Sequence, residues 1–516
     1  MVSPNIAWIL KNLGEHREEN IYADDRGPAI SVNKLAGRAG VLYEKVRYMV
    51  DYKEEHTIRR SAIARILNIK LLIERGADVG LPLLQELVGG GYLPNKTVPE
   101  ALGYDIQNIV DKYLALGGDE VPLSTLGSLM ASEIERMLYP QQINVLVAEA
   151  FYATARDQIK YVGTVDESEL QTQTFIACRR SLLKDDQDTL LYAVLVRALP
   201  ELIDPHTEES IRALSPRFVR TVRAVEESLQ NPLGWRMTAK LRNHAIYFSV
   251  IKELIKRYGA MAEPLFSNPE RLEGEVKKFL GEKYDQQKQL LTRSGARAVV
   301  YIFATKIILA LLLELPYERF FLPAVDYFAL GTNILFHPLL LFGIVQTTQL
   351  PPASNTDRIV ASVLSVVRGD KSERIYIKPQ TDNWALLLVF GALYAALFGI
   401  SFGLVISVLT ALHFNIVSII LFLFFLTFVS YFGFRIRHNA NVWKIYVEKE
   451  GILSLLGNLL AMPIVRTGRW LSTRFASMNI FVFLLDFILE TPFKFVLGTF
   501  DSFITFLKEK GEDPYY

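Results

Sequence analysis

Four polar residues within long apolar stretches are the strongest candidates for chemistry in this sequence. Lys306, Asp326, Asn333 and His337 lie in two neighbouring segments that are hydrophobic enough to cross a bilayer. Asp326, Asn333 and His337 are spaced by 7 and 4 residues, so a helix places them on one face. Ionisable groups inside a membrane are costly and usually face a bundle interior or a wet cavity. One interpretation is therefore a polar pathway in which Lys306 and His337 bind a proton or an ion.

The alternative interpretation is structural, and the sequence favours it. Lys306, Asn333 and His337 would form hydrogen bonds between helices, while Asp326 and Glu314 would extend toward the outer interface of the bilayer. In that case the polar residues fix how the helices pack, and they transport nothing.

A hydrolase-like motif lies in the most apolar part of the chain. Residues 399–403 match the pattern G-x-S-x-G, but that chemistry needs a strand-turn-helix elbow, and this motif sits inside an apolar span. A ridge of small residues, which allows another helix to approach closely, explains it better. The ridge recurs every four positions and consists of Gly391, Ala395, Gly399, Gly403 and Ser407. The sequence does not say whether the partner helix belongs to the same chain.

Motifs for metal, nucleotide or disulfide chemistry are missing. The sequence has a single cysteine, Cys178, and contains neither H-E-x-x-H, nor a P-loop, nor G-x-G-x-x-G. The net charge is only +1, which argues against nucleic acid as a partner. We therefore predict no catalytic, cofactor-binding or metal-binding residues and do not favour an enzyme.

Basic residues recur at helical spacing in three places. The first two sets are expected to form solvated faces, with contact to anionic lipid or an acidic partner as the alternative; they are Arg59, Arg60, Arg65, Lys70 and Arg75, and then Arg217, Arg220 and Arg223. The third set is Arg466, Arg469 and Arg474, which we expect near lipid headgroups. A Phe-rich amphipathic helix over residues 475–507 follows it and is expected to lie in the membrane interface. Packing of this helix against the spans, or a fifth span, are the alternatives.

Hydropathy and loop charge together predict four membrane spans. No Lys, Arg, Asp or Glu lies between Asp382 and Arg435. The spans are predicted at residues 298–315, 323–345, 384–410 and 416–434. The flanks before span one and after span four and the loop between spans two and three hold fourteen Lys and Arg residues, whereas the other two loops hold one, Arg319. The positive-inside rule then places both termini in the cytoplasm of a multi-pass protein.

The rest of the chain reads as helices. Residues 1–292 are predicted to be a cytosolic all-helical domain, residues 293–440 a transmembrane domain and residues 441–516 a membrane-interfacial amphipathic region. Ser3-Pro4, Ser215-Pro216 and Asn268-Pro269 predict helix starts with proline at the first helical position. Residues 277–291 are expected to continue as a polar helix into span one. The predicted fold class is all-α.

One segment carries a resemblance. Residues 50–67, VDYKEEHTIRRSAIARIL, resemble a segment of uncharacterised predicted membrane proteins from uncultured bacteria with small genomes. The likeness covers this run and the layout of the chain. It implies a bacterial inner membrane and brings no activity or functional residue with it.

These patterns favour a membrane-anchored scaffold or interaction platform on the cytoplasmic face. A small transporter or channel that uses the polar residues of spans one and two is the alternative. The expected partners are the lipid bilayer and an unidentified protein or a second copy of the chain. No cofactor is expected.

Overall fold

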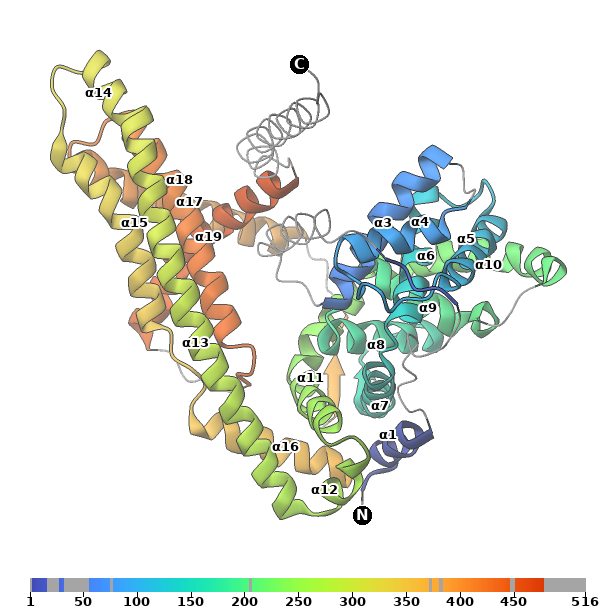
Figure 1. Cartoon of the computed structure of the whole chain (residues 1–516). Coiled ribbons are helices and arrows are strands. Elements are labelled where there is room, and N and C mark those ends of the chain that lie inside the picture. Colours follow the sequence, from blue (N-terminus) through green and yellow to red (C-terminus); the bar gives the residue numbers. More distant parts are fainter. Residues whose placement is uncertain are drawn as a thin grey trace, which may run out of the picture. The chain divides into compact units, whose positions relative to one another are not determined.

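The computed structural model describes residues 2–15, 27–31, 55–74, 78–203, 207–370, 374–379, 384–445 and 451–477 (Figure 1). Regular structure in these residues is almost entirely helical, which confirms the all-α prediction. The chain forms two compact units. Unit 1 consists of Met1–Leu280 and Thr356–Gln380, and unit 2 consists of Gly281–Asn355 and Thr381–Tyr516.

Unit 1 is a bundle of helices with a large aromatic and aliphatic core. The ring of Phe151 stacks on that of Phe248 at 4.6 Å between centroids, and Tyr113 and Phe218 are also fully buried. Its helices are α1 (Pro4–Glu15), α3 (Glu55–Glu74), α4 (Gly80–Gly89), α5 (Leu102–Gly117), α6 (Leu123–Leu138), α7 (Gln142–Gln158), α8 (Glu167–Leu182), α9 (Gln187–Ala198), α10 (Glu208–Gln230), α11 (Pro232–Tyr258) and α12 (Ala262–Ser267), with 3-10 turns η1 (Pro200–Ile203) and η2 (Gly259–Met261).

Two of the three proline signals mark helix starts. Helix α1 begins at Pro4, and α13 (Pro269–Leu309) begins at Pro269, as predicted. The prediction at Ser215-Pro216 was wrong, because Pro216 lies inside α10. That helix begins earlier, where the Thr207 side chain accepts a hydrogen bond from the Ser210 amide and the Ser210 hydroxyl accepts one from the Thr207 amide. A reciprocal cap of this kind satisfies free amides at a helix start and overrides the proline signal downstream.

The segment between spans two and three folds into unit 1. It contains most of α16 (Ala353–Arg368) and strand β2 (Ile375–Ile377). Strand β2 pairs in parallel with β1 (Ile159–Tyr161), with Ile159 opposite Ile375. At the end of α16 the Ser3 amide donates to the Val367 carbonyl at 2.7 Å. The predicted transmembrane region, residues 293–440, thus contains a segment that belongs to the other compact unit.

Unit 2 contains the four helices long and apolar enough to span a membrane. The first is continuous with the polar part of α13, as expected, and passes through the π-helical turn η3 (Ala310–Glu314) into α14 (Leu315–Phe321). The other three are α15 (Tyr327–Thr347), α17 (Trp384–Ala411) and α18 (Ile416–Ala440). Each coincides with one predicted span.

A further helix, α19 (Ile452–Ser477), packs along α18 and α17. A Cβ atom built on Gly468 would lie 2.0 Å from the Thr427 carbonyl oxygen, so the two backbones touch at this point. The predicted interfacial helix over residues 475–507 falls almost wholly outside the described residues.

Candidate functional site

The π-helical turn in span one brings two oppositely charged residues onto one face. Residues eight apart in an α-helix, such as Lys306 and Glu314, are separated by about 80° around the axis. A π-turn contains one extra residue per turn, so Lys306 and Glu314 take the positions of residues seven apart in an α-helix. Such residues lie within about 20° of each other around the axis. The turn occurs next to Pro316, which has no amide hydrogen to donate to the Leu312 carbonyl. The Leu315 amide donates to the Ala310 carbonyl, five residues back, which is the hydrogen bond of a π-helix.

An asparagine on α15 bridges the two charges. Lys306 Nζ donates to Asn333 Oδ1 at 2.6 Å, and Asn333 Nδ2 donates to Glu314 Oε1. Lys306 Nζ also lies 4.3 Å from the ring centroid of Phe425 on α18. Lys306, Glu314 and Asn333 are 3 %, 2 % and 0 % exposed, so the two charged side chains and the asparagine between them are buried among the helices. Such pairing is the usual way in which a membrane interior tolerates charge.

His337 lies one turn from this bridge. Its Nδ1 is 3.2 Å from the Asn333 carbonyl oxygen, and its Nε2 is 3.0 Å from the Phe422 carbonyl oxygen on α18. A neutral imidazole has one N–H and can donate to only one of these acceptors, whereas an imidazolium satisfies both. His337 therefore joins α15 to α18 when its N–H is on Nε2, from where it donates to the Phe422 carbonyl.

Asp326 does not contact Lys306, Asn333 or His337, with which the sequence grouped it, but forms hydrogen bonds with other residues. Its carboxylate accepts from the amides of Phe328 and Ala329 at 3.0 Å and so caps α15. Its own amide donates to Glu318 Oε2, and the other oxygen of Glu318 accepts from Asn415 Nδ2 at 2.7 Å. The structure therefore brings Lys306, Asn333 and His337 together, adds Glu314, and places Asp326 in a second polar group at the ends of α15 and α18.

An apolar layer lies on the other side of the bridge. Leu341, Val429 and Ile436 form a buried cluster, against which Ala298, Val299 and Ile302 of α13 pack. The polar groups described here therefore lie on α15 between Asp326 and His337, and the apolar cluster around Leu341 follows them along the same helix.

The predicted small-residue ridge is open in the structure. Nothing lies within 4 Å of a Cβ atom built on Gly391, Gly399 or Gly403, and Ala395 and Ser407 are exposed. Within the described residues the ridge therefore contacts no other helix. Ser401, the serine of the hydrolase-like motif, is helical, and its hydroxyl donates to the Leu397 carbonyl at 2.8 Å.

The arginines predicted near lipid headgroups lie on α19. The Arg466 guanidinium is 5.1 Å from the ring centroid of Tyr394 on α17, while Arg469 and Arg474 are exposed. Arg466 therefore contributes to the packing of α19 against α17.

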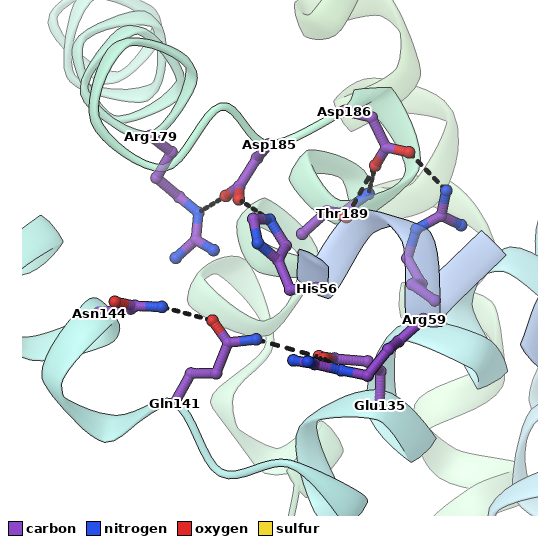
Figure 2. A network of polar contacts seen from close by, with 10 residues as sticks. His56, Arg59, Glu135, Gln141, Asn144, Arg179, Asp185, Asp186 and Thr189 are labelled. Carbon is purple, nitrogen blue, oxygen red and sulfur yellow. Dashed lines mark hydrogen bonds and ion pairs between the residues drawn. The ribbon is translucent and has the colours of Figure 1, made fainter. Parts of the chain in front are cut away.

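Two arginines of the basic face predicted on α3, Arg59 and Arg60, form ion pairs with carboxylates of unit 1, which corrects the expectation of a solvated surface for these two. Figure 2 shows Arg59 beside Glu135, and Arg75 lies outside the described residues. Arg60 is 4 % exposed and donates to Asp186 Oδ2 at 2.5 Å. Arg59 donates twice to Glu135 Oε1 on α6, at 2.9 and 3.1 Å. The carboxylates come from α6 and from the α8–α9 connection, which are distant in sequence, so periodicity on α3 could not reveal them.

Asp185 lies between Arg179 and His56, as Figure 2 shows. It accepts from Arg179 Nε at 2.6 Å and bonds His56 Nε2 at 3.0 Å. Burial alone would raise the pKa of Asp185, but the charge of Arg179 and the hydrogen bond to His56 outweigh it and hold that pKa below its usual range. At Glu135 burial dominates over Arg59, and the pKa of Glu135 is raised. The network ties α3 to the α8–α9 connection and is structural.

No cluster of metal-binding side chains occurs in the part of the chain that the structure describes. That part contains no group of three His, Cys, Asp or Glu side chains placed to hold a metal. A shallow pocket beside α6, α9 and α10 is lined by hydroxyls and carboxylates, including Ser124, Ser128, Asp188 and Glu226. The single thiol, Cys178, is fully buried, and burial raises its pKa, which makes it a poor nucleophile.

No protein-family model, curated protein or solved structure matches this chain.

Proposed function

We propose that this protein is a membrane-anchored interaction platform, in which four spans hold a helical unit at the cytoplasmic face of a bacterial inner membrane. The observation that carries the proposal is the division of the chain. Unit 1 is built from Met1–Leu280 and Thr356–Gln380, so the chain passes between the two units three times. Three connections restrain a domain far more than one flexible linker, as a platform at a membrane requires.

The same observation supports the orientation. Residues 356–380 fold together with residues 1–280, which requires an even number of spans between them, and two helices of spanning length lie there. The basic residues of the flanks and of this segment then share one side, which the positive-inside rule makes cytoplasmic.

The interior of unit 2 supports an anchoring role. The charges of Lys306 and Glu314 are paired through Asn333, and an apolar layer around Leu341 follows. A set of polar groups that bond one another across helices positions those helices, and among the described residues the apolar cluster around Leu341 comes next along α15.

Site-specific photocrosslinking of the full chain in its native membrane tests the platform. A photoreactive residue replaces Trp8, Leu72 or Tyr104, which are exposed on unit 1, or Leu387 on α17 as the control. We expect discrete protein adducts from unit 1 positions and lipid adducts from position 387. Absence of protein adducts from every unit 1 position, together with an unchanged phenotype when the chain is deleted, would refute the platform.

Transport is the second candidate, because buried ionisable residues at mid-span often mark ion pathways and π-turns are frequent at functional sites. Flux of protons or ions is measured in liposomes with the native chain and with Lys306→Leu/Asn333→Leu/His337→Leu. Thr347→Leu/Thr410→Leu, at exposed positions of α15 and α17, is the matched control. Transport requires a flux that the triple variant abolishes and the control retains.

A further inference from the structure

A basic and aromatic stripe runs along the exposed face of β2. In the sequence Arg374-Ile375-Tyr376-Ile377-Lys378, alternate residues of a strand point to opposite sides. Ile377 is buried, whereas Arg374, Tyr376 and Lys378 are exposed, Tyr376 by 56 %. The outward face of the strand is thus basic, aromatic and basic in turn.

The neighbouring elements extend the stripe. Lys160 on β1 lies directly opposite Tyr376 in the parallel register and is exposed. On α11, Arg236 NH1 donates to the Lys378 carbonyl at 2.6 Å, which fixes the end of the strand beside this helix. We call Lys160, Arg236, Arg374, Tyr376 and Lys378 the β2 patch. It contains four cations, and within the described residues no acidic side chain forms an ion pair with any of them.

Chain length limits how far the β2 patch can lie from span three. Lys378 and Trp384, the first residue of α17, are six residues apart. Six extended residues reach at most about 22 Å. Whatever orientation unit 1 takes, Lys378 of the β2 patch therefore remains within that reach of the start of a helix with membrane-spanning length.

We infer that the β2 patch docks on anionic phospholipid headgroups. Arg and Lys side chains bind lipid phosphates, and an exposed tyrosine suits the headgroup layer because its ring is apolar and its hydroxyl polar. The inference rests on the proposed membrane insertion of α17. A membrane is favoured over an acidic protein because the patch is tied to a span by six residues and gains a high local concentration of lipid.

Fluorescence quenching in vesicles tests this inference on the full chain. Cys178 is replaced by Ala, and an environment-sensitive label is attached at Tyr376→Cys, at Tyr104→Cys or at Phe390→Cys on α17. The vesicles contain phosphatidylcholine with a headgroup spin-labelled lipid, with or without phosphatidylglycerol. Quenching at position 376 is expected to rise with phosphatidylglycerol, while position 104 stays unquenched and position 390 is quenched in both.

Charge neutralisation provides the matched test. Each basic residue near an anionic surface contributes about fivefold to binding. Arg374→Gln/Lys378→Gln is therefore expected to lower the ratio of docked to undocked unit by about 25-fold and to return position 376 to its signal in pure phosphatidylcholine. Arg212→Gln/Arg220→Gln, on the exposed side of α10, should leave it unchanged.

Two results would overturn the inference. Quenching at position 376 that is independent of phosphatidylglycerol means that the patch does not recognise anionic headgroups. Quenching equal to that at position 104 means that the patch does not face lipid and leaves an acidic protein as its ligand. Absence of quenching at position 390 means instead that α17 is not inserted, and then the proposed function fails as well.

Discussion

Lys306 and Asn333 are joined across two helices by a 2.6 Å hydrogen bond, with both side chains enclosed. Asn333 passes the interaction on to Glu314, so one amide satisfies a cation and a carboxylate at once. The arrangement depends on the π-turn at Ala310–Glu314, which rotates Glu314 toward Lys306.

The bridge between Lys306 and Glu314 predicts that removing one charge lowers the free energy of unfolding more than removing both. Lys306→Met leaves Glu314 buried without its cation and should lower the free energy of unfolding by about 3 kcal/mol. Lys306→Met/Glu314→Leu should recover much of that loss, since no unpaired charge remains. Unfolding in mixed detergent micelles measures the stability of both variants. Equal losses in the single and double variants would show that the two residues are not coupled.

Close packing at Gly468 predicts that a larger residue at this position weakens the contact between α19 and α18. Gly468→Val should destabilise the packing of α19 on α18 by about 1–3 kcal/mol, because a Cβ atom collides with the Thr427 backbone. Gly457→Val on the same helix is the control, since nothing lies within 4 Å of a Cβ atom at that position. Limited proteolysis of α19 in nanodiscs reports the difference. Similar cleavage of both variants would contradict the contact.

Asp185 gives unit 1 a defined response to acid. Its pKa is lower in the folded chain than in the unfolded one, so its contribution to stability is present above about pH 3.9 and is lost as the pH falls through the folded value. Asp185→Asn should lower stability by about 3 kcal/mol at neutral pH, because Arg179 and His56 lose a buried partner. The Asp185→Asn variant should also lose less stability on acidification than the native chain, because it has no carboxylate to protonate at this position.

Thermal unfolding followed by circular dichroism between neutral pH and about pH 3 measures both effects. Asp157→Asn, at a side chain that is 72 % exposed, is the control and should behave like the native chain. An Asp185→Asn variant with an unchanged pH profile would show that this carboxyl does not govern the response.

Reporter fusions test the orientation. Fusions after Tyr516 and after Asp370, in the exposed turn that follows α16, should report the cytoplasm. A fusion at His413, which has a positive φ of 61° in the connection between α17 and α18, should report the opposite side. Reversal of any of the three signals would break the four-span topology.

The sequence by itself determined the fold class and the positions of the four helices that are long and apolar enough to span a membrane. Apolar stretches of bilayer length and the break in charge between Asp382 and Arg435 depend on composition along the chain, and any helix of that composition has the same property. Proline placed the starts of α1 and α13 for an equally local reason. The spacing of Asn333 and His337 likewise put them on one face.

Only the tertiary structure decided which partners these residues have. The spacing of Arg59 and Arg60 along α3 predicted a solvated face, but both bind carboxylates, from α6 and from the α8–α9 connection. Glu314 joins Lys306 through a π-turn that helical periodicity does not contain, and the loop segment 356–380 supplies a strand to unit 1. Each outcome depends on contacts between residues far apart in the chain or on a departure from regular helix geometry, and neither leaves a periodic signal in the sequence.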